Sequence, residues 1–215
     1  MLLEQKEFMH TNNVTDYKKE LRYKIRSMAM AMFKKNGIKS VKMDDIANAL
    51  QISKRTLYEI YENKETLLFE CVREDYMRAK EHIRQYACHA ENEMDIIIEF
   101  FNMKMADLGQ IDPKFFSELH KYTNVIEFLH NSHEEEMSNA KTFIESGVKN
   151  GYFVEGLNYE IVLRLGDASM NYIMENKLYL RYGIQEIFRN FWIVMMRGFC
   201  TPKGIECVNE LFSKP

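Results

Sequence analysis

The side chains best suited to chemistry lie in one short polar and basic segment. They are Lys54, Arg55, Thr56 and Tyr58. Ser53 comes directly before them and is a residue type that commonly caps the N-terminus of a helix. In such a helix Leu57 and Tyr61 lie four positions apart on the inward face, which leaves the four polar side chains pointing outward. Arginine can bind guanine through two hydrogen bonds, so this outward face suits a major-groove edge and its phosphates.

Two short helices joined by a turn must position these side chains. Residues 44–50 are predicted to form the first helix. Its apolar residues share one face and are Ile46, Ala47 and Leu50. The second helix begins after Ser53, and a preceding helix over residues 15–36, ended by Gly37, supports the pair from behind. The arrangement predicts a helix-turn-helix, a motif that reads DNA.

Two further lysines lie beside expected helix starts. Lys42 precedes the first helix of the motif, and Lys64 follows Asn63, which can cap the next helix. Free N–H groups and the helix dipole favour anions at such ends, so both lysines suit phosphate contacts. The predicted DNA-binding residues are Lys42, Ser53, Lys54, Arg55, Thr56, Tyr58 and Lys64. For each charged member the alternative is a solvated surface charge.

The segment from Phe33 to Leu67 resembles the DNA-binding domain of the TetR family of transcriptional regulators. That family combines an aromatic residue and a glycine, an Asp-Ile-Ala helix, an Ile-Ser or Val-Ser turn, a Lys-x-Thr-Leu-Tyr recognition helix and an Asn-Lys-Glu-x-Leu helix start. The matching residues are Phe33 and Gly37, Asp45-Ile46-Ala47, Ile52-Ser53, Lys54-Arg55-Thr56-Leu57-Tyr58 and Asn63-Lys64-Glu65-Thr66-Leu67. The resemblance implies a phosphate-binding position for Tyr58.

Four positions depart from the family pattern. Lys42 replaces the usual Ser or Thr cap and cannot accept a backbone N–H, which leaves capping to Asp44 or to water. Gln51 replaces the turn glycine, so this residue either avoids the left-handed region or carries modest strain. Glu59 and Ile60 follow the recognition residues where the family has a polar residue and an aromatic. These changes bear on which DNA sequence is read.

Charge and composition divide the chain into two domains. The net charge is −3 over 215 residues, but residues 18–64 hold 12 Lys and Arg against 5 Asp and Glu. Residues 65–215 hold 16 Lys and Arg against 24 Asp and Glu. The basic N-terminal part is therefore expected to attract DNA phosphates, and the acidic remainder to be repelled by them. Three prolines and nine glycines favour an all-α fold. We expect a flexible arm over 1–14, a three-helix helix-turn-helix DNA-binding domain over 15–63, and a larger C-terminal helical ligand-binding and dimerisation domain over 64–215.

The C-terminal domain is predicted to consist of long helices. The first is a linker helix over about 64–90, which continues an apolar face out of the DNA-binding domain. The expected others are 94–108, 113–122, 125–150, 159–175, 185–199 and 204–212. Four cysteines show no Cys-x-x-Cys spacing, and neither a signal peptide nor a membrane span is recognisable. We therefore expect a cytoplasmic protein with no membrane partner.

The resemblance also implies a homodimer. In the TetR family the last two long helices pair with their copies in a second subunit, and by position these are the helices over 159–175 and 185–199. The residues from Ser146 to Leu165 resemble the point at which the first of these helices begins. The predicted interface residues are Leu165, Ala168, Ser169, Tyr172, Phe188, Trp192, Met195 and Phe199. Ordinary core packing within one chain is the alternative.

Aromatic residues and methionines of the C-terminal domain predict an apolar ligand pocket between its helices. The candidates are Phe100, Met103, Phe116, Tyr122, Phe128, Phe143 and Met174. His130, His133 and Glu134 share a spacing that can hold a metal, but the acidic residues that follow favour a hydrated surface, and we expect no metal and no cofactor. Cys88 or Cys200 could act as a redox sensor, but neither has a basic neighbour that would lower its pKa.

The sequence thus predicts a regulator, not an enzyme, because it holds no phosphate loop, no nucleophile elbow and no opposed carboxylate pair. Its predicted partners are a double-stranded DNA operator with palindromic symmetry, a second copy of the chain, and a small apolar or amphipathic effector that releases DNA. Repression is the expected mode. One alternative is a regulator without a small-molecule ligand, whose C-terminal domain serves dimerisation or protein docking. Another is a helical enzyme.

Overall fold

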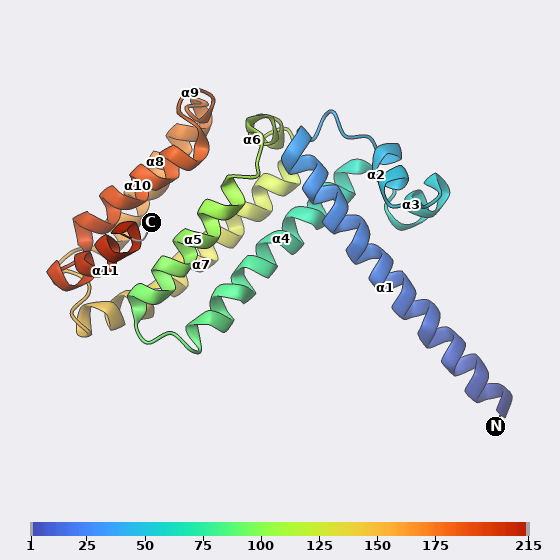
Figure 1. The fold of residues 1–215 in the computed structure, drawn as a ribbon, viewed down its shortest axis with the longest axis horizontal. Helices are drawn as coiled ribbons and strands as arrows, with labels where there is room; N and C mark the ends of the chain where they lie inside the picture. Colours follow the sequence, from blue (N-terminus) through green and yellow to red (C-terminus); the bar gives the residue numbers. More distant parts are fainter. Residues whose placement is uncertain (1, 214–215) are drawn as a thin grey trace.

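The computed structural model describes residues 2–213, and for residues 2–16 it describes the backbone without the side chains. Within this range the regular elements are α-helices, and the predicted all-α class with an N-terminal helix-turn-helix is confirmed (Figure 1). An isolated antiparallel bridge joins Phe153 and Cys200. The helices are α1 (Leu2–Asn36), α2 (Met43–Ala49), α3 (Lys54–Ile60), α4 (Lys64–Ala87), α5 (Glu93–Leu108), α6 (Pro113–Leu119), α7 (Thr123–Lys149), α8 (Tyr159–Glu175), α9 (Tyr179–Tyr182), α10 (Ile184–Phe199) and α11 (Pro202–Ser213).

Helix α1 is longer than its predicted counterpart, because its bounds begin at Leu2. The expected flexible arm over 1–14 falls where side chains lie outside the described residues, and it stays a prediction. The other end of α1 is as predicted. Gly37 adopts a φ of 82°, a left-handed conformation that glycine reaches without a steric penalty, and its N–H donates to the Phe33 carbonyl over 2.9 Å. The chain can therefore turn sharply into α2.

A first hydrophobic core joins α1 to the helix-turn-helix. Ile25 and Phe33 of α1 are fully buried, as are Ile46 of α2 and Leu57 of α3, which the sequence places on inward faces. Leu67 and Leu68 of α4 complete this cluster, as the continuous apolar face of the linker helix indicated. Each side chain removed from water in this way stabilises the fold by about 1.5–3 kcal/mol. The core thus fixes the orientation of α3, with one face packed and the other exposed.

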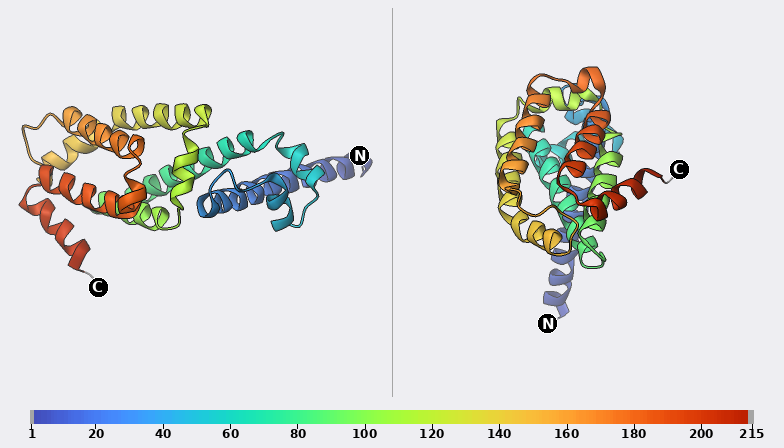
Figure 2. Two further views of the ribbon diagram at one scale, coloured as in Figure 1. Left: turned by 90° about the horizontal axis from the view of Figure 1, so that it is seen from above. Right: turned by 90° about the vertical axis from the view of Figure 1, so that its left-hand side faces the viewer.

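The larger part of the molecule is a layered helical bundle. Helices α4, α5 and α7 lie side by side, and α10 and α11 pack against α5. The left view of Figure 2 shows α7 and α8 on one side and α10 and α11 on the other. A second core cluster forms around Phe101, whose ring lies 4.3 Å from that of Trp192 and 5.6 Å from that of Phe212. No helix within residues 2–213 is long and apolar enough to cross a membrane.

Several predicted helix bounds shift by a few residues. The linker helix ends at Ala87 instead of about residue 90, and α6 ends at Leu119 instead of residue 122. The one-turn helix α9, which follows Lys177 with its φ of 51°, had no predicted counterpart. Helices this short carry little periodic signal, because one turn does not repeat an apolar position.

Candidate nucleic-acid interface

The start of α3 is held by its own cap. Ser53 Oγ accepts the Thr56 N–H over 3.0 Å and lies 2.8 Å from Thr56 Oγ1, as the predicted N-cap requires. Leu57 turns into the core, while Tyr58 is 48% exposed. Lys54 and Arg55 are exposed as predicted, and Thr56 is half-buried. A rigid helix start therefore presents two cations and an aromatic hydroxyl to the outside.

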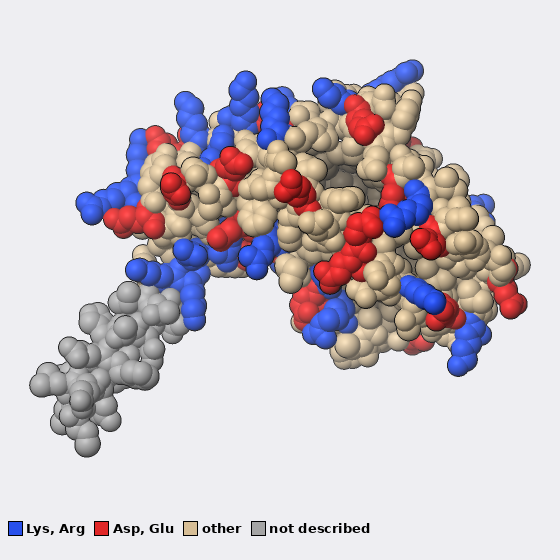
Figure 3. Space-filling view, turned by 180° about the vertical axis from the view of Figure 1, so that it is seen from behind, with Lys and Arg blue, Asp and Glu red and all other residues tan. Residues whose placement is uncertain are grey.

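Both cations of α3 are paired within the motif. Lys54 forms a close ion pair with Asp44 of α2, and Arg55 Nε donates to Glu59 Oε1 over 2.8 Å. The hydrogen bonds with these carboxylates raise the pKa of both basic groups above their ordinary values. Exposed ion pairs contribute only about 0–1 kcal/mol, and a DNA phosphate or base can replace the carboxylates at small cost. Figure 3 shows Lys and Arg side chains projecting from this end of the molecule, with Asp and Glu among them.

The cap of α2 differs from the expectation for Lys42. The Lys42 side chain makes no capping bond and is exposed, while Asp45 Oδ2 accepts the Lys42 N–H over 2.9 Å. The prediction that Asp44 takes the capping role is wrong, because Asp44 is engaged by Lys54 and the capping carboxylate is that of Asp45, one residue further on. An acidic residue at the third helical position reaches back to the cap more easily than one at the second. The Lys42 ammonium is left on the surface of the motif.

Gln51 occupies the left-handed region at the turn between α2 and α3. Its φ is 54°, which settles the two alternatives in favour of backbone strain. The following Ile52 N–H donates to the Ala47 carbonyl over 3.0 Å and closes the turn. The departure from glycine therefore leaves the turn geometry of the motif in place.

Lys64 binds the backbone of the loop between α1 and α2. Its ammonium donates to the carbonyls of Ile38 and Val41 over 2.9 and 3.0 Å. Burial lowers its pKa, against a smaller raising effect of Glu118. These bonds hold the loop that carries Lys42, so Lys64 has a structural task that the sequence did not reveal. Its predicted phosphate contact stays a prediction.

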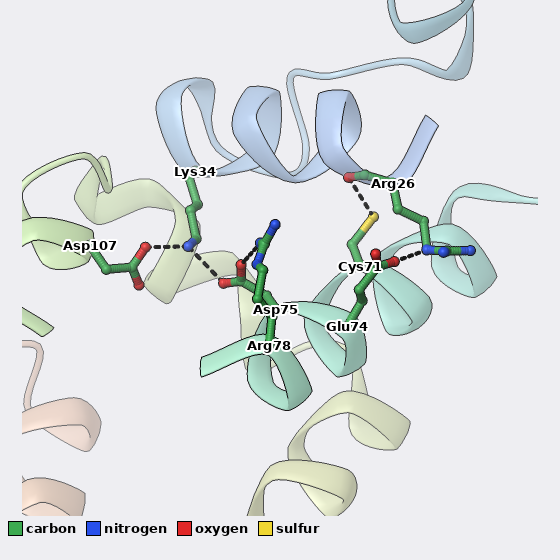
Figure 4. Close-up of polar contacts among 7 residues, drawn as sticks. All are labelled: Arg26, Lys34, Cys71, Glu74, Asp75, Arg78 and Asp107. Atoms are coloured by element: carbon green, nitrogen blue, oxygen red, sulfur yellow. Dashed lines mark hydrogen bonds and ion pairs between the residues drawn. The ribbon is translucent and has the colours of Figure 1, made fainter. Parts of the chain in front are cut away.

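Two charged residues of α1 that sequence reasoning missed connect this motif to the rest of the chain (Figure 4). Arg26 forms a close ion pair with Glu74 of α4, and its Nη1 lies 3.1 Å from the Tyr61 hydroxyl. Lys34 Nζ lies 2.7 Å from Asp75 Oδ2 and also pairs with Asp107 at the end of α5. No local pattern in the sequence marks these two residues, because their partners lie 35 to 73 residues further along the chain. Helix α1, which supports the motif from behind, is thereby linked by ion pairs to both α4 and α5.

Helix α6 adds backbone contacts to the same end of α1. The Asp112 N–H donates to the Lys34 carbonyl over 2.8 Å, and Glu118 Oε2 accepts the Lys39 N–H over 2.6 Å. A Cβ on Gly37 would lie 3.0 Å from Lys114 Cβ, so the two segments are closely packed. A shift of α6 must therefore act on the loop before α2.

The predicted interface residues divide into two groups. On α8, Leu165 and Tyr172 are 63% and 59% exposed, and Ala168 and Ser169 are also exposed. On α10, Trp192 is buried against Phe101 within the same chain, and Phe188, Met195 and Phe199 are half-buried. Exposed apolar residues that the prediction did not include are Ile161 on α8 and Val194 on α10, at 57% and 70%. The interface itself stays a prediction.

The predicted pocket residues lie in different places. Phe116 and Tyr122 pack on the first core cluster, whereas Phe143 packs on the second. Phe128 contacts the rings of Phe69 and Tyr76, and Phe100 lies under the Lys104 ammonium. Met103 and Met174 are half-buried. A groove of about 810 Å³ lies elsewhere, between α7 and α8, and none of these residues lines it. The predicted ligand site remains untested.

Two exposed histidines, one of which is His133 of the spacing noted in the sequence, lie beside carboxylates. His133 Nε2 lies 2.7 Å from Asp167 Oδ1, and His82 Nε2 lies 2.6 Å from Glu99 Oε1. Among the described side chains no three His, Cys, Asp or Glu residues gather in a metal-binding group. Burial raises the pKa of the Cys200 thiol to about 11, which disfavours a reactive thiolate there.

Comparison with known proteins gives this site a context. Residues 25–71 match the family model described as "Bacterial regulatory proteins, tetR family". Similar solved structures include a TetR-family regulator from Agrobacterium tumefaciens, which is 12% identical, with a TM-score of 0.67, 86% of this chain and 100% of that chain covered. A transcriptional regulator from Saccharomonospora viridis in complex with choline is 13% identical, with a TM-score of 0.67 and coverages of 85% and 99%.

A third similar structure is a TetR regulator from Chloroflexus aurantiacus, which is 16% identical, with a TM-score of 0.62 and coverages of 85% and 95%. At these identities the likeness shows a shared fold alone. No curated protein sequence matches this chain.

Proposed function

We propose that this chain, a member of the TetR family of bacterial regulatory proteins, represses transcription by binding a palindromic operator as a homodimer until a small molecule releases it. The family makes the chain a DNA-binding transcription regulator. The observation that carries the finer proposal is the exposed face of α3, on which Lys54, Arg55 and Tyr58 project from a capped and packed helix.

The DNA contacts follow from the geometry of α3. Its first turn enters the major groove, where Arg55 exchanges Glu59 for the O6 and N7 atoms of a guanine. Thr56 contacts a thymine methyl group or a phosphate, and Tyr58 and Lys42 bind phosphates on either side. Each bidentate base contact discriminates against the wrong base by about 1–3 kcal/mol.

The exposed apolar face of α8 supports the homodimer. Ile161, Leu165 and Tyr172 recur at positions that share one side of the helix, and each is more than half exposed. Monomers seldom expose such a continuous apolar stripe, and a two-fold interface would cover it with the same face of a second copy. Two copies of α3 would then read two half-sites separated by about one helical turn of DNA, about 34 Å.

The links between α1 and the C-terminal bundle support ligand release. Lys34 is shared by α4 and α5, and Glu118 of α6 holds the backbone of Lys39. A ligand that displaces any of these helices moves the motif and spoils the spacing of the two recognition helices. If it binds the released form about 100-fold better, operator affinity falls by about 2.7 kcal/mol.

Selection of bound sequences from a pool of random duplexes tests the proposal. We expect the full-length chain to enrich one palindromic sequence, and two chains to bind each duplex in sedimentation measurements. The variant Tyr58→Ala should bind the enriched duplex more weakly. The control variant Tyr86→Ala changes another exposed tyrosine, at the far end of α4, and should bind as the wild type does. A pool that shows no enrichment, or an enriched sequence without two-fold symmetry, would contradict the proposal.

A further inference from the structure

The groove between α7 and α8 has the dimensions of a ligand site. Its volume of about 810 Å³ falls within the range of about 300–1,000 Å³ that small-molecule sites occupy. Met137 and Ile144 of α7 line it on one side, and Leu157 and Leu163 line it from the loop and from α8. The groove therefore offers an apolar surface long enough for a hydrocarbon chain or a ring system.

The charged lining of the groove has an excess of carboxylate. The Arg164 guanidinium is engaged by Glu134 through contacts of 2.8 and 3.3 Å, and Lys141 lies 3.8 Å from Glu145. Glu160, an exposed residue in the first turn of α8, lines the same groove; its charge helps to raise the pKa of Arg164 one turn along the helix, but among the described side chains Glu160 forms no ion pair within 4.0 Å. One negative charge is thus left over at the end of the groove where α8 begins.

Two donor groups in the lining of the groove are already bound within the chain. The Tyr159 hydroxyl donates to the Val154 carbonyl over 2.7 Å, and the Arg164 donors are directed at Glu134. The carboxylate of Glu160 can accept, and a charge-assisted bond from an ammonium is stronger than a bond between neutral groups. An anionic ligand would meet the same carboxylate as a repulsive charge.

A ligand in the groove would lie next to the ion pairs that join α7 to α8. Helix α8 is bonded to α7 by the pairs His133–Asp167 and Glu134–Arg164, at 2.7 and 2.8 Å. Its adjoining face carries the exposed residues Leu165 and Tyr172. A molecule between the two helices therefore alters the position of the exposed stripe that we assign to the partner subunit.

We propose that this groove binds a small molecule in which a primary ammonium is attached to an apolar body. The ammonium lies at Glu160, and the apolar body lies on Met137, Ile144, Leu157 and Leu163. The role of this molecule as the effector rests on the proposed function, whereas the site itself does not. None of the residues predicted from the sequence as pocket residues takes part.

Calorimetry with two probes of equal chain length tests the site. Decylammonium and decanoate, both below their micelle concentrations, are titrated into the full-length chain at pH 7. We expect one decylammonium to bind per chain. In water, two unit charges about 4 Å apart interact by about 1 kcal/mol, a factor of about 5 in affinity. Decylammonium gains this factor by attraction to Glu160 and decanoate loses it by repulsion, so decanoate should bind about 25-fold more weakly.

Two matched variants assign the charge. Glu160→Gln should weaken decylammonium binding about 5-fold. Glu175→Gln removes the same charge from the other end of α8, outside the groove, and should leave the affinity unchanged. Equal binding of both probes, equal effects of the two variants, or no saturable binding of decylammonium would overturn the site. The calorimetry contains no DNA, so it tests the groove independently of the proposed function. A chain that binds decylammonium in this experiment but binds no duplex in the selection experiment would contradict only the proposed function.

Discussion

Replacement of Lys34 by methionine tests whether the contact between α1, α4 and α5 holds the motif to the bundle. The Lys34 side chain is 13% exposed, and its partners Asp75 and Asp107 are 23% and 42% exposed. Lys34→Met keeps an apolar stem but leaves Asp75 with Arg78 as its remaining partner. Removal of one member of a fully buried pair costs about 3–5 kcal/mol, and an exposed pair contributes about 0–1. We expect the free energy of unfolding to fall by about 2 kcal/mol at pH 7.

Urea unfolding followed by helical circular dichroism measures this loss, and its pH dependence identifies the cause. Burial by itself would raise the pKa of Asp75, but the hydrogen bonds and charges of Lys34 and Arg78 outweigh it and lower the pKa. A lowered pKa in the folded state stabilises the protein above the unfolded value of about 3.9, and this stability is lost as the pH falls through the folded value. The difference between the wild type and Lys34→Met should therefore shrink below about pH 4.

The control for Lys34→Met is Lys35→Met, an exposed lysine on the same helix, which should change stability by less than about 0.5 kcal/mol. Two results would refute the reasoning. One is a loss no larger than that of the control. The other is a difference that stays constant from pH 7 to pH 3, since a packing effect of the side chain has no such titration.

Three further predictions concern the turn, the loop and the interface. Gln51→Gly should raise the urea midpoint by the equivalent of about 1 kcal/mol, because glycine adopts a φ of 54° without strain, and an unchanged or lower midpoint would argue against strain there. Lys64→Met should lower the thermal midpoint by the equivalent of about 1–3 kcal/mol, since two carbonyls lose their donor, whereas Lys42→Met should not, and equal effects would contradict the role of Lys64. Leu165→Glu places a charge on the exposed stripe of α8 and should shift sedimentation toward the monomer, whereas Asn171→Glu should leave it unchanged. If the Leu165→Glu variant still sediments as a dimer, the interface lies elsewhere.

The features that could be predicted from the sequence are set by residues close together in the chain. Ser53 and Asn63 each cap a helix as expected, because a cap binds an N–H only three residues away. The buried face of the helix-turn-helix follows from apolar residues spaced by one turn. The exposure of Arg55 follows in turn, since it lies on the side of α3 opposite Leu57, and Tyr58 lies at the edge of that exposed side.

The features that could not be predicted depend on partners far along the chain. Lys34 pairs with Asp75, 41 residues away, and Lys64 binds carbonyls more than 20 residues before it. Nothing in the local pattern distinguishes these lysines from those that face solvent. The groove between α7 and α8 was missed for a similar reason. Its lining is mostly charged and aliphatic, while the prediction favoured aromatic residues, many of which fill the two core clusters.

The most direct test of the central claim is the affinity of the wild type and of Arg55→Ala for two duplexes, measured by fluorescence anisotropy at one salt concentration. One duplex carries the selected operator, and the other has an unrelated sequence of the same length. If Arg55 reads a base, the substitution should cost about 1–3 kcal/mol on the operator and much less on the unrelated duplex. An equal loss on both duplexes would show that Arg55 contacts only the phosphates and that α3 does not read sequence through it.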